Sequence, residues 1–322
     1  MKKIAVVILN WNGVRLLEQF LPSVMSYSPE ATIYLADNAS TDSSIEFVKT
    51  NYPDIKIIQN EGNFGYAQGY NVALKYVEEP YFCLLNSDVE VTENWLKPIL
   101  EIFEKEKNIA IIQPKILEYA GAAGGFIDKY GYPYCRGRIF ETVEKDNGQY
   151  DDFSEIFWAS GACFFIRKEV FNQLGGFDES FFAHQEEIDL CWRSKNAGYK
   201  TYYTFQSIIY HVGGATLKES NPKKTFLNFR NSLLMLVKNL PEGKILPIIF
   251  TRLFLDGIAG IQFILKGKFS HCWAIIKAHF HFYHLLNKYL KKRTNNQTES
   301  YFKTNSIVYN YFIKGGKVFE EN

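Results

Sequence analysis

Short, uninterrupted apolar runs alternate with longer segments of helical spacing along the first 114 residues. Runs such as 4–9 and 81–85 are apolar throughout, which is typical of strands buried on both faces of a parallel sheet. Segments such as 14–25 repeat large apolar residues every three or four positions, as amphipathic helices do. This alternation of strand, polar loop and helix predicts an α/β fold with a doubly wound, mixed but mostly parallel sheet and helices on both faces.

The same patterns place further elements along the chain. Further strands are expected at 32–36, 55–59, 109–114, 162–166 and 207–210. One further helix is expected to begin near 45, and another to run from the glycine-rich loop at 60–69 to about 77. Helices are also expected over 95–107, 168–174, 188–197 and 226–234. The section 115–154 breaks the rhythm and is expected to be irregular or to form short antiparallel strands.

Three expected strands end in polar loops, at 10–13, 37–42 and 86–88, and a glycine-rich loop at 60–69 follows another. The carboxyl ends of parallel strands meet at one edge of a sheet, where ligands bind, so these loops are expected to lie together. There Asp88 can hold a hard divalent cation, which in turn can hold a diphosphate. The alternative is a simple turn, because Asn, Ser and Asp all favour turns. Dinucleotide-binding and P-loop glycine motifs do not follow the first strand, which disfavours those classes.

A second chemical focus consists of Glu186, Glu187 and Asp189, near the start of the helix expected over 188–197. Aromatic and apolar neighbours on both sides suggest a partly buried site, where a carboxylate can be tuned towards a general base. Two structural alternatives stay open. One is favourable negative charge at a helix N-terminus, and the other is a surface salt bridge from Asp189 to Arg193, four residues on.

His211 follows the strand expected at 207–210 and precedes Gly213 and Gly214. A lone histidine at the end of a strand is more often structural than a ligand. The two glycines favour a binding role, because they let the backbone approach a ligand closely.

The two parts of the chain carry opposite charge. Residues 1–224 contain 22 Lys and Arg against 30 Asp and Glu, whereas residues 225–322 contain 14 against 5. The basic part is suited to an anionic surface. Within it, 245–265 is apolar and has about the length of a membrane span. Arg252 and Asp256 interrupt this run, so we expect an amphipathic helix that lies on a membrane or packs on the body.

The segment 273–290 mixes aromatic and basic residues, which suits an anionic bilayer interface. The alternative is a helical cap that completes the body and turns a solvated basic face outward. Five scattered cysteines without a Cys-x-x-Cys pair indicate a reducing compartment. The first apolar run is too short for a signal peptide. We therefore expect a cytoplasmic protein, peripheral on the inner face of the cell membrane, with no nucleic-acid partner.

Seven short segments occur in an order that is typical of one family: 7–13, 37–42, 63–67, 85–89, 175–179, 186–193 and 211–214. Together they resemble the family-2 inverting glycosyltransferases of GT-A fold, in the bacterial branch that includes rhamnosyltransferases of cell-surface polysaccharide synthesis. The pair Arg230-Asn231 also resembles a recurrent feature of this branch. The resemblance implies a GT-A catalytic domain at 1–224, with a nucleotide-sugar half at about 1–114 and an acceptor half at about 115–224, and a helical, basic region at 225–322.

The resemblance also implies roles for single residues. The nucleotide would be bound by Asn10, Trp11, Asn12, Asp37, Asn63, Gly65, Asn86, Ser87 and Arg193. Asp88 would bind the divalent cation, Mg²⁺ or Mn²⁺, with His211 as a second contact. Glu187 would be the base, with Glu186 and Asp189 as alternatives, because the family usually has Asp at that position. The family's metal motif is often Asp-x-Asp, and here Asn86 stands first, which leaves one carboxylate.

The implied reaction moves a sugar from a dTDP- or UDP-linked donor, with dTDP-rhamnose as one candidate, to a glycan or polyprenyl-linked saccharide. The transfer would proceed with inversion, in a single displacement. Two other functions stay open: a non-catalytic nucleotide-sugar-binding membrane scaffold, and a sugar-phosphate nucleotidyltransferase. The second usually has a glycine-rich basic loop after its first strand, where this chain has 10–13 instead.

Overall fold

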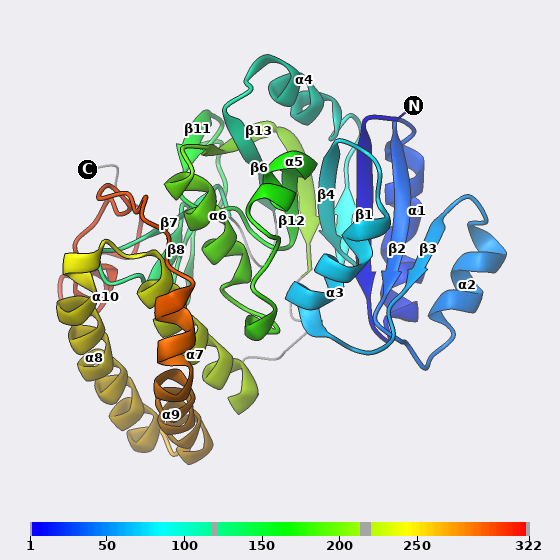
Figure 1. Cartoon of the computed structure of the whole chain (residues 1–322). Helices are drawn as coiled ribbons and strands as arrows, with labels where there is room; N and C mark the ends of the chain where they lie inside the picture. The colour runs from blue at the N-terminus through cyan, green and yellow to red at the C-terminus, as the bar shows by residue number, and fades with distance from the viewer. Residues whose placement is uncertain (1, 118–121, 213–219, 320–322) are drawn as a thin grey trace.

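A mixed nine-stranded sheet forms the centre of the computed structural model, which describes residues 2–117, 122–212 and 220–319 (Figure 1). Its order is β11-β13-β6-β12-β4-β1-β2-β3, with β5 paired to β13. The strands are β1 (Ile4–Asn10), β2 (Ala31–Asp37), β3 (Lys56–Gln59), β4 (Tyr81–Asn86), β5 (Val89–Val91), β6 (Ile109–Leu117), β11 (Phe153–Ile156), β12 (Cys163–Arg167) and β13 (Lys200–His211). Pairing makes β5, β11 and β12 run against the other strands, so the expected mixed, mostly parallel sheet is confirmed.

Helices cover both faces of this sheet because its central strands are apolar on both sides. In β1, Val6 belongs to a buried cluster with Leu17 of α1, whereas Val7 belongs to another with Tyr70 of α3. The helices of the body are α1 (Val14–Tyr27), α2 (Ser44–Asn51), α3 (Gly65–Ala73), α4 (Lys97–Lys105), α5 (Lys168–Gln173) and α6 (Glu186–Asn196). Uninterrupted apolar strands therefore correspond to two hydrophobic cores, one on each face.

The section expected to break the rhythm does form short antiparallel strands. They are β7 (Gly125–Ile127), β8 (Pro133–Cys135), β9 (Arg138–Ile139) and β10 (Thr142–Val143), in a second sheet of order β10-β9-β8-β7. The strand β13 begins at Lys200, earlier than expected, because its polar first part pairs with β6 and β11.

The basic part of the chain is helical, as expected, with α7 (Pro222–Asn239), α8 (Ile245–Leu265), α9 (Phe269–Lys291) and α10 (Ile307–Phe312). In Figure 1, α7, α8 and α9 lie together on the side of the molecule away from β3 and α2. The helix α7 packs against α6, α8 and α9. Asn221 caps the N-terminus of α7, because its side-chain oxygen accepts from Lys223 N at 2.9 Å. The segment that ends in α10 meets the small sheet, where Thr142 and Tyr311 hydroxyls are 3.0 Å apart.

Candidate active site

The carboxyl ends of β1, β2 and β4 lie side by side, which confirms that their polar loops share one edge of the sheet. Asn10 pairs in register with Asp37, and Leu9 pairs with Asn86. A Cβ on Gly13 would lie 3.8 Å from the Ser87 hydroxyl, so the loops after β1 and β4 face each other.

Hydrogen bonds tie the loop after β1 to the loop after β2. The buried Asn10 donates from Nδ2 to Asp37 Oδ1 at 2.9 Å and to the Ser40 hydroxyl at 3.1 Å. Asn12 Oδ1 accepts from Thr41 N at 2.7 Å. The oxygen Oδ1 of Asn10 is buried without a partner among the described residues, and the Trp11 side chain is 56% exposed. Asp37 is fully buried, and its hydrogen bonds hold this loop in place. The Asn10 Oδ1 atom and the Trp11 ring are therefore free to contact a ligand.

The glycine-rich loop contacts the segment that precedes the acidic cluster. Asn63 Oδ1 accepts from Gly65 N at 3.1 Å, and Tyr66 N donates to Phe182 O at 2.7 Å. Gly65 has a φ of 72°, and a Cβ on it would lie 2.4 Å from Phe182 O. Only glycine fits such a close approach at positive φ. The Tyr66 hydroxyl donates to Gly161 O at 2.9 Å. The next residue, Ala162, accepts from Asn86 N.

Asp88 and His211 are brought together by a short strand that the sequence did not predict. The strand β5 pairs with the end of β13, so that His211 lies opposite Val89. His211 Nε2 is 3.2 Å from Asp88 Oδ1, and the other ring nitrogen, Nδ1, is buried without a partner among the described residues. Gly213 and Gly214 lie outside the described residues.

This donor set fits a divalent cation that takes its remaining ligands from phosphate oxygens and water. Mg²⁺ in particular is commonly held by one or two carboxylates together with substrate phosphates. Asp88 supplies one buried carboxylate and His211 one ring nitrogen. Among residues 2–117, 122–212 and 220–319, no group of three or more His, Cys, Asp or Glu side chains is placed to hold a metal by itself.

Glu186 and Glu187 are the first two residues of α6 and differ from Asp189 in their surroundings. Burial raises the pKa of Glu187 to about 7, although its side chain stays partly exposed. Glu186 is buried, and burial together with the charge of Glu187 raises its pKa well above the usual range. The Oε2 atoms of both have no partner within the described part of the chain. Glu187 therefore combines the protonation range of a base near neutral pH with a partly exposed position at the start of α6.

Asp189 is instead locked in a buried ionic network. Its Oδ2 is 2.8 Å from Arg193 Nε and 2.8 Å from Lys238 Nζ, and its Oδ1 accepts from Asn239 at 2.9 Å. Burial alone would raise the pKa of Asp189, but Lys238 and Arg193 lower it. Arg193 also donates to Leu174 O and Gly176 O, at 2.7 and 2.8 Å. The spacing of four residues thus reflects a buried ion pair, and this geometry favours structural roles for Asp189 and Arg193.

Lys238 also neutralises Asp178, at 3.0 Å, and Lys292 at the end of α9 contacts the same carboxylate at 2.8 Å. Burial opposes ionisation of Asp178, but Lys238 and Lys292 lower its pKa. An aspartate with a lowered folded pKa stabilises the fold above its unfolded pKa of about 4, and this contribution is lost as the pH falls through the folded value. The network thus joins α6 to α7 and α9.

Replacing Lys238 with methionine is expected to lower the free energy of unfolding by about 3 kcal/mol at pH 7, because it leaves Asp189 buried with less compensation. The deficit should shrink as the pH falls below about 4, where protonation of the aspartates removes the uncompensated charge. Urea unfolding at pH values from about 2 to 8 measures both effects. Lys195→Met, which breaks a surface pair with Glu155, is the control and should cost about 1 kcal/mol or less. Equal losses in the two variants would contradict the network.

The loop before α6 has strained backbone and is held by α7. Phe182, His184 and Gln185 have φ values of 64°, 70° and 74°, which non-glycine residues rarely adopt. Asn231 Nδ2 lies 2.8 to 3.0 Å from the carbonyl oxygens of Phe181, Ala183 and His184. Arg230 Nη2 donates to Ser180 O at 2.8 Å and to Asn231 Oδ1 at 2.7 Å. The sequence pointed to the Arg230-Asn231 pair but not to this contact with the loop that leads to Glu187.

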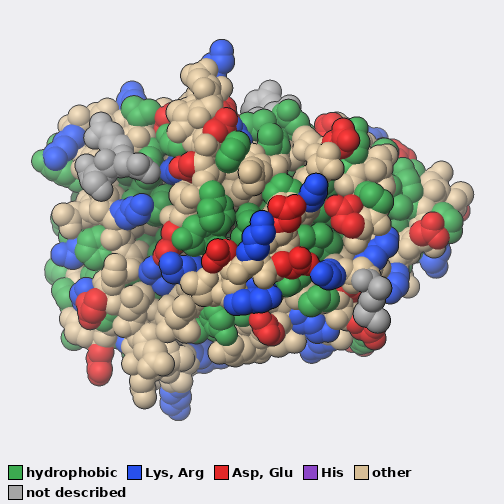
Figure 2. Space-filling model, turned by 90° about the horizontal axis from the view of Figure 1, so that it is seen from above, with side chains coloured by type: hydrophobic (Ala, Val, Ile, Leu, Met, Phe, Trp, Pro, Cys, Tyr) green, Lys and Arg blue, Asp and Glu red, His purple; other side chains and the backbone are tan. Residues whose placement is uncertain are grey.

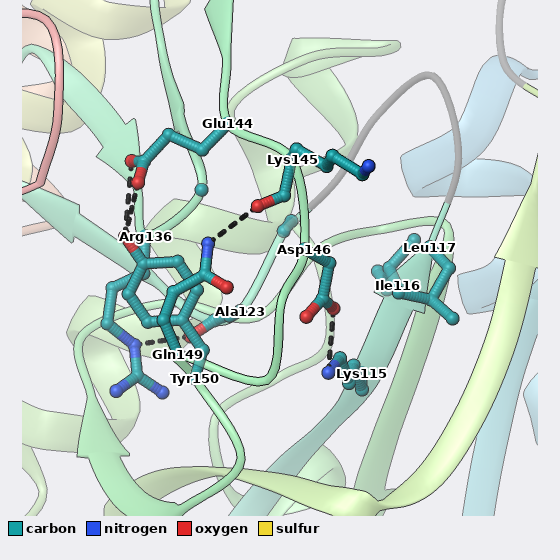
Figure 3. A pocket seen from close by; sticks show the side chains of 12 residues that line it. Lys115, Ile116, Leu117, Ala123, Arg136, Glu144, Lys145, Asp146, Gln149 and Tyr150 are labelled. Atoms are coloured by element: carbon teal, nitrogen blue, oxygen red, sulfur yellow. Dashed lines mark hydrogen bonds and ion pairs between the residues drawn. The ribbon is translucent and has the colours of Figure 1, made fainter.

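A separate cavity of about 230 Å³ lies between the end of β6 and the loops at 136–150 (Figure 3). Its buried cations are already paired: Lys115 Nζ is 2.6 Å from Asp146, and Arg136 donates to both oxygens of Asp152. Tyr150 donates its hydroxyl to Glu144 at 3.0 Å. Lys115 and Arg136 are therefore not available to hold an anion such as a diphosphate.

Solved glycosyltransferases share this arrangement of sheet and helices. S. aureus TarS 1–349, solved in complex with UDP-GlcNAc, matches with a TM-score of 0.61 at 16% identity, over 90% of this chain and 84% of that one. The mannosyltransferase PcManGT from Pyrobaculum calidifontis, solved with GDP-Man and Mn²⁺, matches with a TM-score of 0.54 at 12% identity, over 87% of each chain. The fold is therefore that of the GT-A glycosyltransferases. Residues 5–175 match the family described as Glycosyl transferase family 2, and the chain belongs to this family.

Two curated relatives are named as enzymes that transfer sugars. An N-acetylglucosaminyl-diphospho-decaprenol L-rhamnosyltransferase of Mycobacterium tuberculosis is 24% identical over 219 residues, which are 61% of this chain and 71% of the relative. The low-salt glycan biosynthesis hexosyltransferase Agl10 of Haloferax volcanii is 25% identical over 240 residues, 72% and 74% of the two chains. The expected resemblance to glycosyltransferases of this kind is confirmed.

Proposed function

We propose that this protein transfers a sugar from a nucleotide-diphosphate sugar to a glycan or polyprenyl-linked saccharide, with inversion at the anomeric carbon. The observation that carries the proposal is Glu187, a partly exposed residue whose carboxyl has a raised pKa. It lies on the helix that follows the loop in which the Phe182 carbonyl accepts from Tyr66 N and Ala67 N. A dTDP- or UDP-linked donor, with dTDP-rhamnose first among candidates, is supported by the name of the rhamnosyltransferase relative.

In this proposal the donor lies along the carboxyl edge of β1, β2 and β4. The nucleotide is bound by residues of the loops at this edge: Asn10, Trp11, Asn12, Asp37, Asn63, Gly65, Asn86 and Ser87. Asn10 and Trp11 offer an unpartnered oxygen and an exposed ring, while Asp37 shapes the loop from beneath. Arg193 acts indirectly, by tying α6 to the carbonyl oxygens of Leu174 and Gly176.

Asp88 and His211 would hold the divalent cation, Mg²⁺ or Mn²⁺, against the diphosphate. When bound, the cation offsets the negative charge that develops on the leaving diphosphate. Glu187 accepts the proton of the acceptor hydroxyl as that oxygen forms a bond to the anomeric carbon. The bond from this carbon to the diphosphate oxygen breaks in the same step, so the configuration inverts and no covalent enzyme intermediate forms.

An acceptor on a polyprenyl lipid would place the reaction at the inner face of the cell membrane, with the protein attached peripherally from the cytoplasm. The relative from Mycobacterium tuberculosis is named for such a diphospho-decaprenol acceptor, which supports this part of the proposal.

Turnover with defined donors tests the proposal. The protein would be incubated with dTDP-rhamnose, UDP-GlcNAc, UDP-glucose or GDP-mannose, each with Mn²⁺ or Mg²⁺, and with a detergent-solubilised polyprenyl-diphospho-N-acetylglucosamine. We expect one dTDP- or UDP-linked donor to give a product one sugar heavier by mass spectrometry. Proton NMR of that product should show the anomeric configuration opposite to the donor's. A product with retained configuration would rule out the single displacement.

A further inference from the structure

The helix α8 carries a row of large apolar side chains on the outside of the molecule. Its exposed residues recur every three or four positions and so form one face of the helix: Leu246, Phe250, Phe254, Ile258, Ile261 and Leu265. Phe250 and Phe254 are 77% and 65% exposed. With the turn before it, α8 is the one helix in the described part of the chain that is long and apolar enough to cross a membrane.

The charged residues of α8 point the other way, into the protein. Arg252 donates to Tyr130 O at 2.9 Å and lies over the Tyr132 ring, 3.9 Å from its centroid. Asp256 is fully buried and contacts His279 of α9 at 3.2 Å. These contacts fix α8 along the protein body, with its apolar face turned out. A helix on the surface of a water-soluble protein usually turns its polar face outward. The helix α8 does the opposite, because its charged residues face the protein and its apolar row faces outward.

The next helix, α9, continues this arrangement. Its exposed apolar residues also recur along one side: Phe269, Trp273, Ile276, Phe280, Tyr283 and Leu290. The two helices pack on each other through the Phe263 and His271 rings, 5.0 Å apart, and are joined by a turn at Gly267. In Figure 1 this α8–α9 hairpin forms one flank of the molecule. The face on the side of α4 differs, since it interleaves positive, negative and scattered apolar side chains (Figure 2).

The exposed charges of the hairpin are all positive. Lys266 and Lys268 lie at its turn, and Lys277 and Lys288 lie along α9, all of them exposed. Lys277 Nζ is 5.8 Å from the centre of the exposed Trp273 ring. From 245 to 291 the one acidic residue is the buried Asp256. Apolar and aromatic side chains bordered by lysines complement a bilayer that carries anionic headgroups.

We propose that the α8–α9 hairpin is a membrane-docking surface, which lies in the plane of an anionic bilayer without crossing it. The apolar rows enter the headgroup boundary, and the lysines contact lipid phosphates. This deepens the proposed function, because it sets the active site beside a membrane that carries the acceptor. The binding itself requires neither donor nor turnover.

Sedimentation of the full chain with vesicles tests the surface. Vesicles of phosphatidylcholine alone would be compared with vesicles containing about a third phosphatidylglycerol, at low and high salt. We expect binding to the anionic vesicles that weakens with salt, and at least a tenfold loss of affinity in Phe250→Glu/Phe254→Glu. Lys266→Glu/Lys268→Glu should lower binding to anionic vesicles without altering any apolar contact. The control is Tyr76→Glu, an exposed aromatic residue far from the hairpin in sequence, which should bind as wild type does.

Three outcomes would overturn the proposal. Wild type could fail to bind either vesicle, or the double phenylalanine variant could bind as tightly as wild type. In the third outcome, vesicle binding is absent and light scattering shows a dimer that the double phenylalanine variant abolishes. A second copy of the chain would then cover this face. Thermal shift with the donor nucleotide, measured on each variant, confirms that folding and the donor site are intact. Failure to find turnover would leave the vesicle result unchanged, so the two proposals fail separately.

Discussion

Replacing Glu187 with glutamine is expected to lower kcat about a thousandfold while leaving donor affinity nearly unchanged. Glutamine keeps the size of the side chain but cannot accept the proton of the acceptor hydroxyl, and loss of a general base costs on the order of 10² to 10⁴ in rate. Donor binding does not require the base, so the loss should appear in kcat. Initial rates with saturating donor, together with donor affinity by calorimetry, separate the two quantities.

Glu186→Gln is the matched control for this change. Burial and the charge of Glu187 raise the pKa of Glu186 and so favour its neutral form, which glutamine resembles. We expect it to change kcat by about tenfold or less. The wild-type rate should rise with pH through about 7, because Glu187 must lose its proton to act as the base. A large loss in Glu186→Gln with an active Glu187→Gln enzyme would move the role of base to Glu186.

The same residue gives a readout independent of turnover. A carboxyl whose folded pKa is raised stabilises the fold when protonated, and this contribution is lost as the pH rises from its unfolded pKa through about 7. Glu187→Gln is therefore expected to melt at a higher temperature than wild type at pH 8, and to show a smaller difference at pH 5. Such a gain on removing the charge of the proposed base would be a stability–activity trade-off.

Replacing Asp88 with alanine is expected to weaken metal-dependent donor binding about a hundredfold. The variant removes the one carboxylate of the pair with His211, and the cation then loses its main anchor on the protein. In wild type, a nucleotide diphosphate at 100 times its dissociation constant adds about 2.7 kcal/mol of stability. The Mn²⁺-dependent part of the resulting thermal shift should disappear in Asp88→Ala.

Asp54→Ala is the control for the loss of one negative charge, because Asp54 is an exposed carboxylate outside the site. It should keep the full thermal shift. His211→Gln should give an intermediate effect, since the carboxylate of Asp88 remains. A shift of equal size in Asp88→Ala and wild type, with and without Mn²⁺, would show that the diphosphate is held without this residue.

Local pattern was enough to predict the parts of the fold that depend on one segment at a time. The apolar runs of β1, β2 and β4 predict strands covered on both faces, and the polar loops that follow them meet at one edge of the sheet. The strand β5 has three residues, too few for a periodic pattern, so the pairing that sets His211 beside Asp88 was invisible. Asp189 also pairs with Lys238, which is 49 residues away in the chain. A pattern within one segment cannot predict such a distant contact.

Choosing among the three acids also required the structure. The sequence placed all three near one helix start, where each had similar neighbours. Burial and pairing separate them, because Asp189 forms ion pairs with two cations, whereas Glu187 forms none with the described residues. Likewise, Arg252 and Asp256 looked like interruptions of an apolar helix, yet they are the residues that hold its inner face to the body.

The contact of Asn231 with three loop carbonyl oxygens has a consequence for how the C-terminal helices can change in evolution. Asn231 belongs to α7, which packs against the hairpin helix α9 and is tied to it by Thr225 and His271 at 2.7 Å. A recombination that exchanged the C-terminal helices for those of a relative would also exchange the amide that supports the loop before Glu187. A replacement for the C-terminal helices would therefore need a side chain that donates to the same carbonyl oxygens as Asn231 does. If the proposed roles hold, the helices that meet the membrane and the loop that positions the base must be inherited together.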